Sequence, residues 1–216
     1  MSDKQLLNEK SGLKGSRLWG ILLFLVLLFV DQVTKILADV YFVEIAPNES
    51  IKIIPGMLEL CISYNRGIAF GSFSTSSEWV KIAIVVGTAL MMVALALIYW
   101  KIDKRRSLLR LALVLIIAGG IGNFIDRVYY RVWDPMSAGI IRDGVRDMVR
   151  LNILIDFGIC NFADFFISVG AVLLVLSLLF FDTDALIPLG KKYRALAKES
   201  EEKAQAKKEN KEKSNG

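Results

Sequence analysis

The chain has 216 residues, of which 54% are hydrophobic, and carries a formal net charge of +5. Its mean hydropathy of +0.48 is too high for a typical soluble domain, and its length suits one structural unit. The absence of histidine excludes Ser–His and Cys–His nucleophile pairs and HExxH zinc sites. The positive charge does not indicate nucleic acid, because the basic residues flank apolar segments, where they orient membrane helices.

The pattern of apolar runs predicts four membrane-spanning helices. The first run, 18–30, has only thirteen residues and is shorter than the ~20 needed to span a bilayer. No small-residue cleavage site follows it, so we interpret it as part of an uncleaved helix over about 17–38. The other spans are predicted at about 79–100, 108–128 and 161–181.

Two outer-face loops, 39–77 and 129–160, connect these spans. The first contains Pro47, Pro55 and Gly56 between short runs rich in Ile and Val. Residues 57–63 alternate loosely in the manner of a strand. The predicted fold is therefore a mainly α membrane protein of four helices with a small β-rich subdomain on the outer face.

The distribution of basic residues predicts the orientation. The N-terminal segment, the 101–106 loop with Arg110, and the tail from Lys191 together hold 18 of the 27 Lys and Arg residues. By the positive-inside rule, both termini are cytoplasmic. We expect a cytoplasmic segment at 1–16, a membrane domain at 17–182, and a charged, low-complexity cytoplasmic tail at 183–216 without catalytic residues.

With this orientation, polar residues of three spans converge at the outer face. Each group has a simple structural explanation. Asn161 and Asp164 match an N-cap and an acid at the third helical position, Asp31 and Lys35 an i,i+4 ion pair, and Asp126 and Arg127 a fixed charge pair. However, carboxylates recur at the same depth in three spans, and ionisable groups there are functional candidates. The pattern predicts a functional site.

Five motifs make the family resemblance specific. In chain order they are Asp31-Gln-Val-Thr-Lys35, Asn65-Arg-Gly-Ile-Ala-Phe70, Gly119-Gly-Ile-Gly-Asn-Phe-Ile-Asp-Arg127, Val145-Arg-Asp147 and Asn161-Phe-Ala-Asp164. Together they resemble those of the lipoprotein signal peptidases, the bacterial signal peptidase II family of membrane aspartyl peptidases. The resemblance covers about residues 17 to 181. It implies that no cofactor or metal is needed.

The resemblance implies a catalytic dyad of Asp164 and an upstream aspartate. We choose Asp147, because the 17 residues before Asp164 leave room for a crossing loop; Asp156, only eight residues away, is the alternative. The segment at 128–146 contains an insertion relative to the family pattern. The supporting or substrate-binding residues implied are Asn65, Gly67, Asn123, Asp126, Arg127, Asn161, Asp31 and Lys35.

The implied partners are prolipoprotein signal peptides with a diacylglyceryl-modified cysteine, cleaved immediately before that cysteine, and membrane lipids, with no nucleic acid. We expect a monomer in the bacterial inner membrane, with its active site at the outer face. The alternatives are a proton-coupled transporter, a structural scaffold, and a Ser–Lys peptidase using Lys35 or Lys81 with one of the serines at 63, 72, 74, 76 and 77. Whether Cys61 and Cys160 pair is left open.

Overall fold

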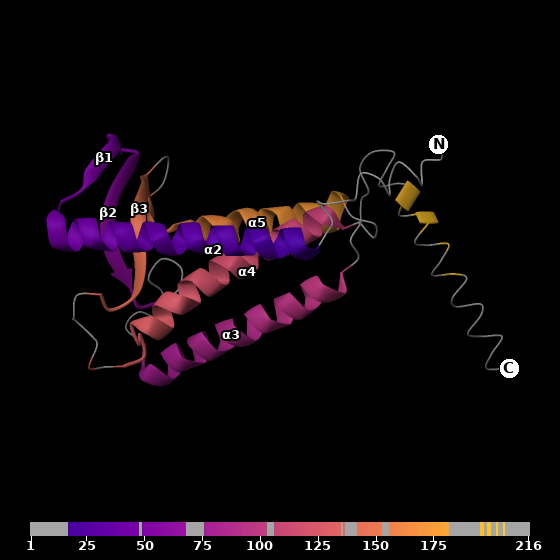
Figure 1. The fold of residues 1–216 in the computed structure, drawn as a ribbon, viewed down its shortest axis with the longest axis horizontal. Coiled ribbons are helices and arrows are strands. Elements are labelled where there is room, and N and C mark those ends of the chain that lie inside the picture. Colours follow the sequence, from indigo (N-terminus) through magenta and orange to yellow (C-terminus); the bar gives the residue numbers. More distant parts are fainter. Residues whose placement is uncertain are drawn as a thin grey trace.

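The computed structural model describes residues 17–47, 49–67, 76–102, 106–134, 136, 142–152 and 156–181, with a few isolated positions between 195 and 205. The expectations for the N-terminal segment and most of the tail, and for Ser72 and Ser74, lie outside these residues. So does the central part of the insertion. Among the described residues, four long helices form a bundle, and a small sheet lies at one end of it (Figure 1).

The four helices are long and apolar enough to cross a membrane, as the sequence predicts. They are α2 (Arg17–Asp39), α3 (Glu78–Lys101), α4 (Ser107–Tyr129) and α5 (Phe162–Phe180). The first span was predicted to end at about residue 38, and α2 ends at Asp39, after which the chain continues as the wider π-helical turn η2 (Val40–Ile45). The first outer loop therefore begins only after residue 45.

Helix α2 buries polar residues and exposes apolar ones. Its buried residues are Gly20, Asp31, Lys35 and Asp39, whereas Leu22, Leu25 and Phe29 are among its exposed side chains. This arrangement is the reverse of a soluble amphipathic helix. It suits a helix whose apolar surface faces lipid and whose polar stripe faces its neighbours.

Helices α4 and α5 pack closely through small residues. A β-carbon on Gly119 would overlap the carbonyl of Ala163, and one on Gly170 would lie 2.9 Å from the carbonyl of Ala112. The buried residues of α5 are Ala163, Gly170 and Ser177, which recur every seven positions along one face. These small residues let the backbones of α4 and α5 approach each other closely.

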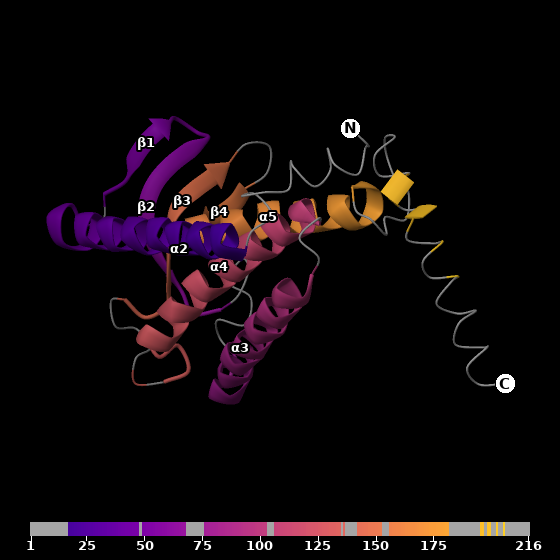
Figure 2. The ribbon, with the colours of Figure 1, turned by 45° about the vertical axis from the view of Figure 1, so that its right-hand side comes forward.

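The sheet has four antiparallel strands in the order β1 (Ile51–Ile54), β2 (Leu58–Asn65), β3 (Val145–Asn152) and β4 (Asp156–Cys160). The first outer loop supplies β1 and β2, and the second supplies β3 and β4. The sequence predicted β-structure only in the first loop. The sheet lies at the end of the bundle where α2 and α4 finish and α5 begins (Figures 1 and 2).

Candidate active site

Lys35 is the centre of a buried ionic cluster between α2 and α4. Its Nζ lies 2.9 Å from Asp31 Oδ2 and 3.6 Å from Asp126 Oδ2, and all three side chains are fully buried. Burying one ammonium with two carboxylates is tolerable only because each charge has close partners. Asp31 also accepts a hydrogen bond from the backbone N–H of Ala163, at 2.9 Å, which ties α2 to the start of α5.

Asn123 connects this cluster to Asp164. Its Oδ1 accepts a hydrogen bond from Lys35 Nζ at 2.8 Å, and its Nδ2 donates to Asp164 Oδ1, also at 2.8 Å. An ammonium group has donors only, so Lys35 selects the carbonyl side of the amide. The amide N–H is therefore directed at the Asp164 carboxylate.

Asn161 begins α5 and joins the two aspartates. Its Oδ1 accepts from the backbone N–H of Asp164 at 3.1 Å, and Asp164 Oδ2 accepts from the backbone N–H of Asn161 at 3.1 Å, which completes a capping box. The remaining amide group of Asn161 donates to Asp147 Oδ1 at 2.6 Å. The cap predicted as a structural feature thus also holds the second carboxylate beside the first.

Asp147 lies on β3, and only 4% of it is exposed. Burial, with a further contribution from the negative charge of Asp164, raises the pKa of Asp147 to about 7. Hydrogen bonds from Asn161 and Asn65 oppose this shift without cancelling it. Asp147 can therefore carry a proton near neutral pH beside a second carboxyl group.

Asp126 binds the strand that carries Asp147. Its Oδ2 accepts from the backbone N–H of Arg146 at 3.0 Å, and its Oδ1 lies 2.6 Å from Arg146 Nη2. The sequence suggested Arg127 as the partner, and that interpretation was wrong. Arg127 instead donates to the carbonyl oxygens of Gly67, at 3.0 Å, and Asn123, at 3.3 Å.

Two contributors were missed from the sequence. Arg146 sits inside the Val-Arg-Asp motif, and Gln32 sits inside the Asp-Gln-Val-Thr-Lys motif, so both were adjacent to chosen residues. Gln32 donates to Asp31 Oδ2 at 3.0 Å and lies 3.3 Å from Arg146 through its Oε1. Only proximity to the motifs could have indicated them.

The other candidate residues lie as follows. Asn65 ends β2, and its Oδ1 accepts from the backbone N–H of Gly67 at 2.9 Å. The backbone of Asp156 begins β4 and pairs with Asn152. Ser63 lies across the ladder from Asp147, and Lys35, one of the two lysines considered for a Ser–Lys pair, lies between the carboxylates of Asp31 and Asp126.

The two cysteines are not paired with each other. Cys61 is buried and free, and Cys160 is partly buried and free. The Cys160 thiol lies 3.3 Å from the carbonyl oxygen of Val149, and burial raises its pKa to about 12. Within the described part of the chain, no three His, Cys, Asp or Glu residues are grouped as metal ligands.

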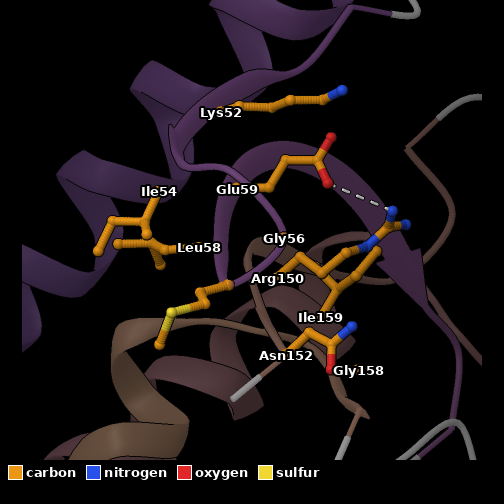
Figure 3. Close-up of a pocket in the computed structure, with 10 residues that line it drawn as sticks. Lys52, Ile54, Gly56, Leu58, Glu59, Arg150, Asn152, Gly158 and Ile159 are labelled. Atoms are coloured by element: carbon orange, nitrogen blue, oxygen red, sulfur yellow. Dashed lines mark ion pairs between the residues drawn. The ribbon is translucent and has the colours of Figure 1, made fainter.

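The face of the sheet opposite the Asp147 side chain, which we call the far face, has a hollow of its own. A hollow of about 440 Å³ opens there, and an ion pair of 3.5 Å between Arg150 and Glu59 crosses it (Figure 3). Arg150 follows Asp147 by three positions on β3, so the two side chains point to opposite faces. The hollow therefore lies on the face of β3 opposite the Asp147 side chain.

Comparison with known proteins gives one consistent result. A model of the family described as signal peptidase (SPase) II matches residues 23–180. A lipoprotein signal peptidase of Fusobacterium nucleatum is 35% identical over 170 residues, which cover 78% of this chain and 90% of that protein. One of Streptococcus thermophilus is 40% identical over 136 residues, which cover 62% of this chain and 77% of that protein.

Solved structures agree with these sequence relatives. Two bacterial membrane enzymes, both determined by the in meso method, superpose with TM-scores of 0.59 and 0.57 at 28% and 27% identity. The matches cover 74% of this chain in both cases, and 87% and 92% of the other chains. The described residues hold four helices long and apolar enough to span a membrane, and the motifs meet at one end of the bundle; this multi-pass bacterial membrane peptidase belongs to the signal peptidase II family.

Proposed function

We propose that this peptidase removes signal peptides from prolipoproteins by aspartyl catalysis, with Asp147 and Asp164 as the paired carboxylates. The observation that carries the proposal is the bridge through Asn161. This one residue donates its side-chain amide to Asp147 Oδ1 at 2.6 Å and its backbone N–H to Asp164 Oδ2 at 3.1 Å. Two carboxyl groups held by one residue share a proton more readily than they ionise together.

The surroundings assign different roles to the two groups. Asp164 accepts hydrogen bonds from Asn161 and Asn123 at the N-terminus of α5, where the helix dipole favours an anion. Asp147, with its raised pKa, holds the shared proton. In the reaction, Asp164 takes a proton from the attacking water while Asp147 donates a hydrogen bond to the scissile carbonyl oxygen.

The buried ionic cluster holds the two carboxyl groups of the dyad in position. Lys35 orients the Asn123 amide that binds Asp164, and Asp126 holds the backbone of β3 next to Asp147. We propose that these residues act by positioning the dyad. Asn65 and Gly67, at the end of β2, are proposed to border the substrate-binding side, because Asn65 contributes a hydrogen bond to Asp147.

The position of the dyad suits a substrate that stays partly in lipid. Both termini are proposed to be cytoplasmic, which places the sheet and the dyad at the outer end of the membrane domain 17–182. The signal helix and the acyl chains of a diacylglyceryl-modified prolipoprotein then remain in the bilayer, and the peptide bond before the modified cysteine reaches the polar end of the bundle. A single chain supplies both carboxylates, in keeping with a monomer.

The test is cleavage of a lipidated prolipoprotein by the wild type and by Asp147→Asn, Asp164→Asn and Asp156→Asn, all reconstituted at equal amounts in lipid. We expect the first two variants to lose activity by about 10²- to 10⁴-fold, the usual contribution of a general acid or base. Asp156→Asn should cleave at the wild-type rate. Full loss of activity in Asp156→Asn, with activity retained in Asp147→Asn, would assign Asp156 to the dyad in place of Asp147. An inactive wild type would refute the proposed reaction.

A further inference from the structure

A second polar cluster lies at the outer end of α2, and the proposed mechanism does not use it. It consists of Asp39, Glu44, Tyr64 and Arg142, which we name the outer latch. Arg142 Nε lies 2.8 Å from Asp39 Oδ2, and its Nη2 lies 2.6 Å from Glu44 Oε1. The Tyr64 hydroxyl donates to Asp39 Oδ1. The latch thus joins α2 and its π-helical extension to β2 and to the segment that enters β3.

The backbone of Arg142 is held in a disfavoured conformation. Its φ is +75°, in the left-handed region that residues with a β-carbon seldom adopt. Such a conformation persists where surrounding contacts impose it. The planar guanidinium group can bind two carboxylates at once, which a lysine ammonium does with less geometric definition. The two ion pairs of Arg142 are therefore among the contacts that hold this segment, beside the 3.5 Å ion pair between Asp143 and Arg66.

Tyr64 completes the latch on the side of the sheet. Burial, with the hydrogen bond to Asp39, raises the pKa of Tyr64 above its ordinary value, so the hydroxyl keeps its proton. Tyr64 also lies across the ladder from Arg146, the residue immediately before Asp147. Through Tyr64, the outer latch therefore includes a residue of the β2–β3 ladder one pair away from Asp147, the proposed catalytic residue.

The chain between Arg142 and Asp147 has little room to shift. A β-carbon on Gly144 would lie 2.6 Å from the backbone C and O atoms of Asn65, so this segment is pressed against the end of β2. The next anchor is Arg146, whose backbone N–H binds Asp126. Arg142 and Arg146 thus fix the two ends of a short segment, one to α2 and the other to α4.

The register of β3 determines where Asp147 points. A slip by one residue would turn its side chain to the opposite face of the sheet, away from Asn161. The ladder between β2 and β3 is irregular between Leu60 and Ser63, directly beside the Asp147 pair. Beyond this irregularity the register is fixed by the pairs of Ser63, Tyr64 and Asn65 with Asp147, Arg146 and Val145, and an anchor just before these pairs limits a slip of β3.

We propose that Arg142 is a positioning residue, which anchors the start of β3 to the outer end of α2 and so keeps Asp147 in place beside Asp164. The inference rests on the proposed function for the importance of Asp147. The anchoring itself rests on the contacts of Arg142 alone. These two parts can be tested separately.

The experiment compares Arg142→Gln, Arg142→Lys and Arg142→Gly with the wild type in lipid nanodiscs. The matched control is Arg150→Gln, which removes an arginine ion pair from the other end of β3, on the far face of the sheet (Figure 3). One measurement is kcat and KM for a lipidated prolipoprotein. The other is amide hydrogen exchange of residues 145–149, which does not depend on activity.

For Arg142→Gln we expect kcat to fall by about 10- to 100-fold, as a misplaced catalytic group does, with KM changed less than about twofold. Exchange at 145–149 should rise by about tenfold. Arg142→Lys should recover part of kcat because it keeps the charge. Arg142→Gly should be as slow as Arg142→Gln, since glycine relieves the backbone but removes both ion pairs. Arg150→Gln should match the wild type.

Two results would overturn the proposal. Wild-type kcat in Arg142→Gly would mean that the side-chain contacts are dispensable, and unchanged exchange in Arg142→Gln would mean that nothing is anchored. Retained cleavage by Asp147→Asn is a different failure. It would refute the assignment of Asp147 to the dyad, while the exchange experiment would still decide whether Arg142 anchors β3.

Discussion

Replacing Asp147 by asparagine should stabilise the folded protein at neutral and alkaline pH. In the folded state the pKa of Asp147 is about 7, against 3.8 for an ordinary aspartate. The folded state therefore keeps a proton that the unfolded state releases, and the free energy of unfolding falls as pH rises from about 4 to about 7. Asparagine resembles the protonated acid and can accept the same hydrogen bond from Asn161, so the variant avoids this loss.

The magnitude follows from the size of the shift. Each pKa unit corresponds to about 1.4 kcal/mol, so the shift bounds the gain at about 4 kcal/mol above pH 7, with no gain below pH 4. The side chain is only 4% exposed, so solvent screening reduces this bound little. Because 1 kcal/mol moves the Tm of a chain of this size by about 2–4 °C, we expect a rise of at least about 5 °C at pH 8.

The assay is thermal unfolding in one detergent at pH 4 and pH 8, followed by tryptophan fluorescence. Glu59→Gln, which removes a partly exposed carboxylate on the far face of the sheet, is the control and should shift the Tm by less than about 2 °C at either pH. A Tm for Asp147→Asn at or below that of the wild type at pH 8 would refute the reasoning. It would mean that the Asp147 carboxylate is not disfavoured by its surroundings.

Three further predictions concern the dyad and the cluster behind it. The kcat/KM for prolipoprotein cleavage should fall about tenfold per pH unit above about pH 7, where Asp147 loses its proton. The measurement is a pH profile of kcat/KM from pH 5 to 9. A profile that stays flat to pH 9 would contradict this prediction. Lys35→Met should destabilise the protein by about 3–5 kcal/mol, because Asp31 and Asp126 lose a buried counter-charge, and Lys35→Met combined with Asp31→Asn should recover part of the lost Tm. Gly122→Ala should reduce both Tm and activity, since the added methyl group would overlap the Asp31 carboxylate, whereas Gly87→Ala, with open space around it, should match the wild type in both assays.

The sequence by itself determined the features that depend on nearby residues. Apolar runs predicted four spans because hydropathy over about 20 residues is a local property, and α3 begins and ends within one residue of its predicted limits. Asn161 and Asp164 predicted the cap of α5 because a capping box needs only residues three positions apart.

Only the tertiary structure decided which distant residues meet. The pairing of β2 with β3 joins segments about 80 residues apart, and their alternation alone cannot specify a partner strand. Asp126 binds Arg146 and not the adjacent Arg127, because the two side chains leave α4 toward different neighbours. Asn161 looked like a helix cap in the sequence, and its second hydrogen bond, to Asp147, exists because folding brings β3 against the start of α5. A buried charge or amide must find a partner, but packing chooses which one.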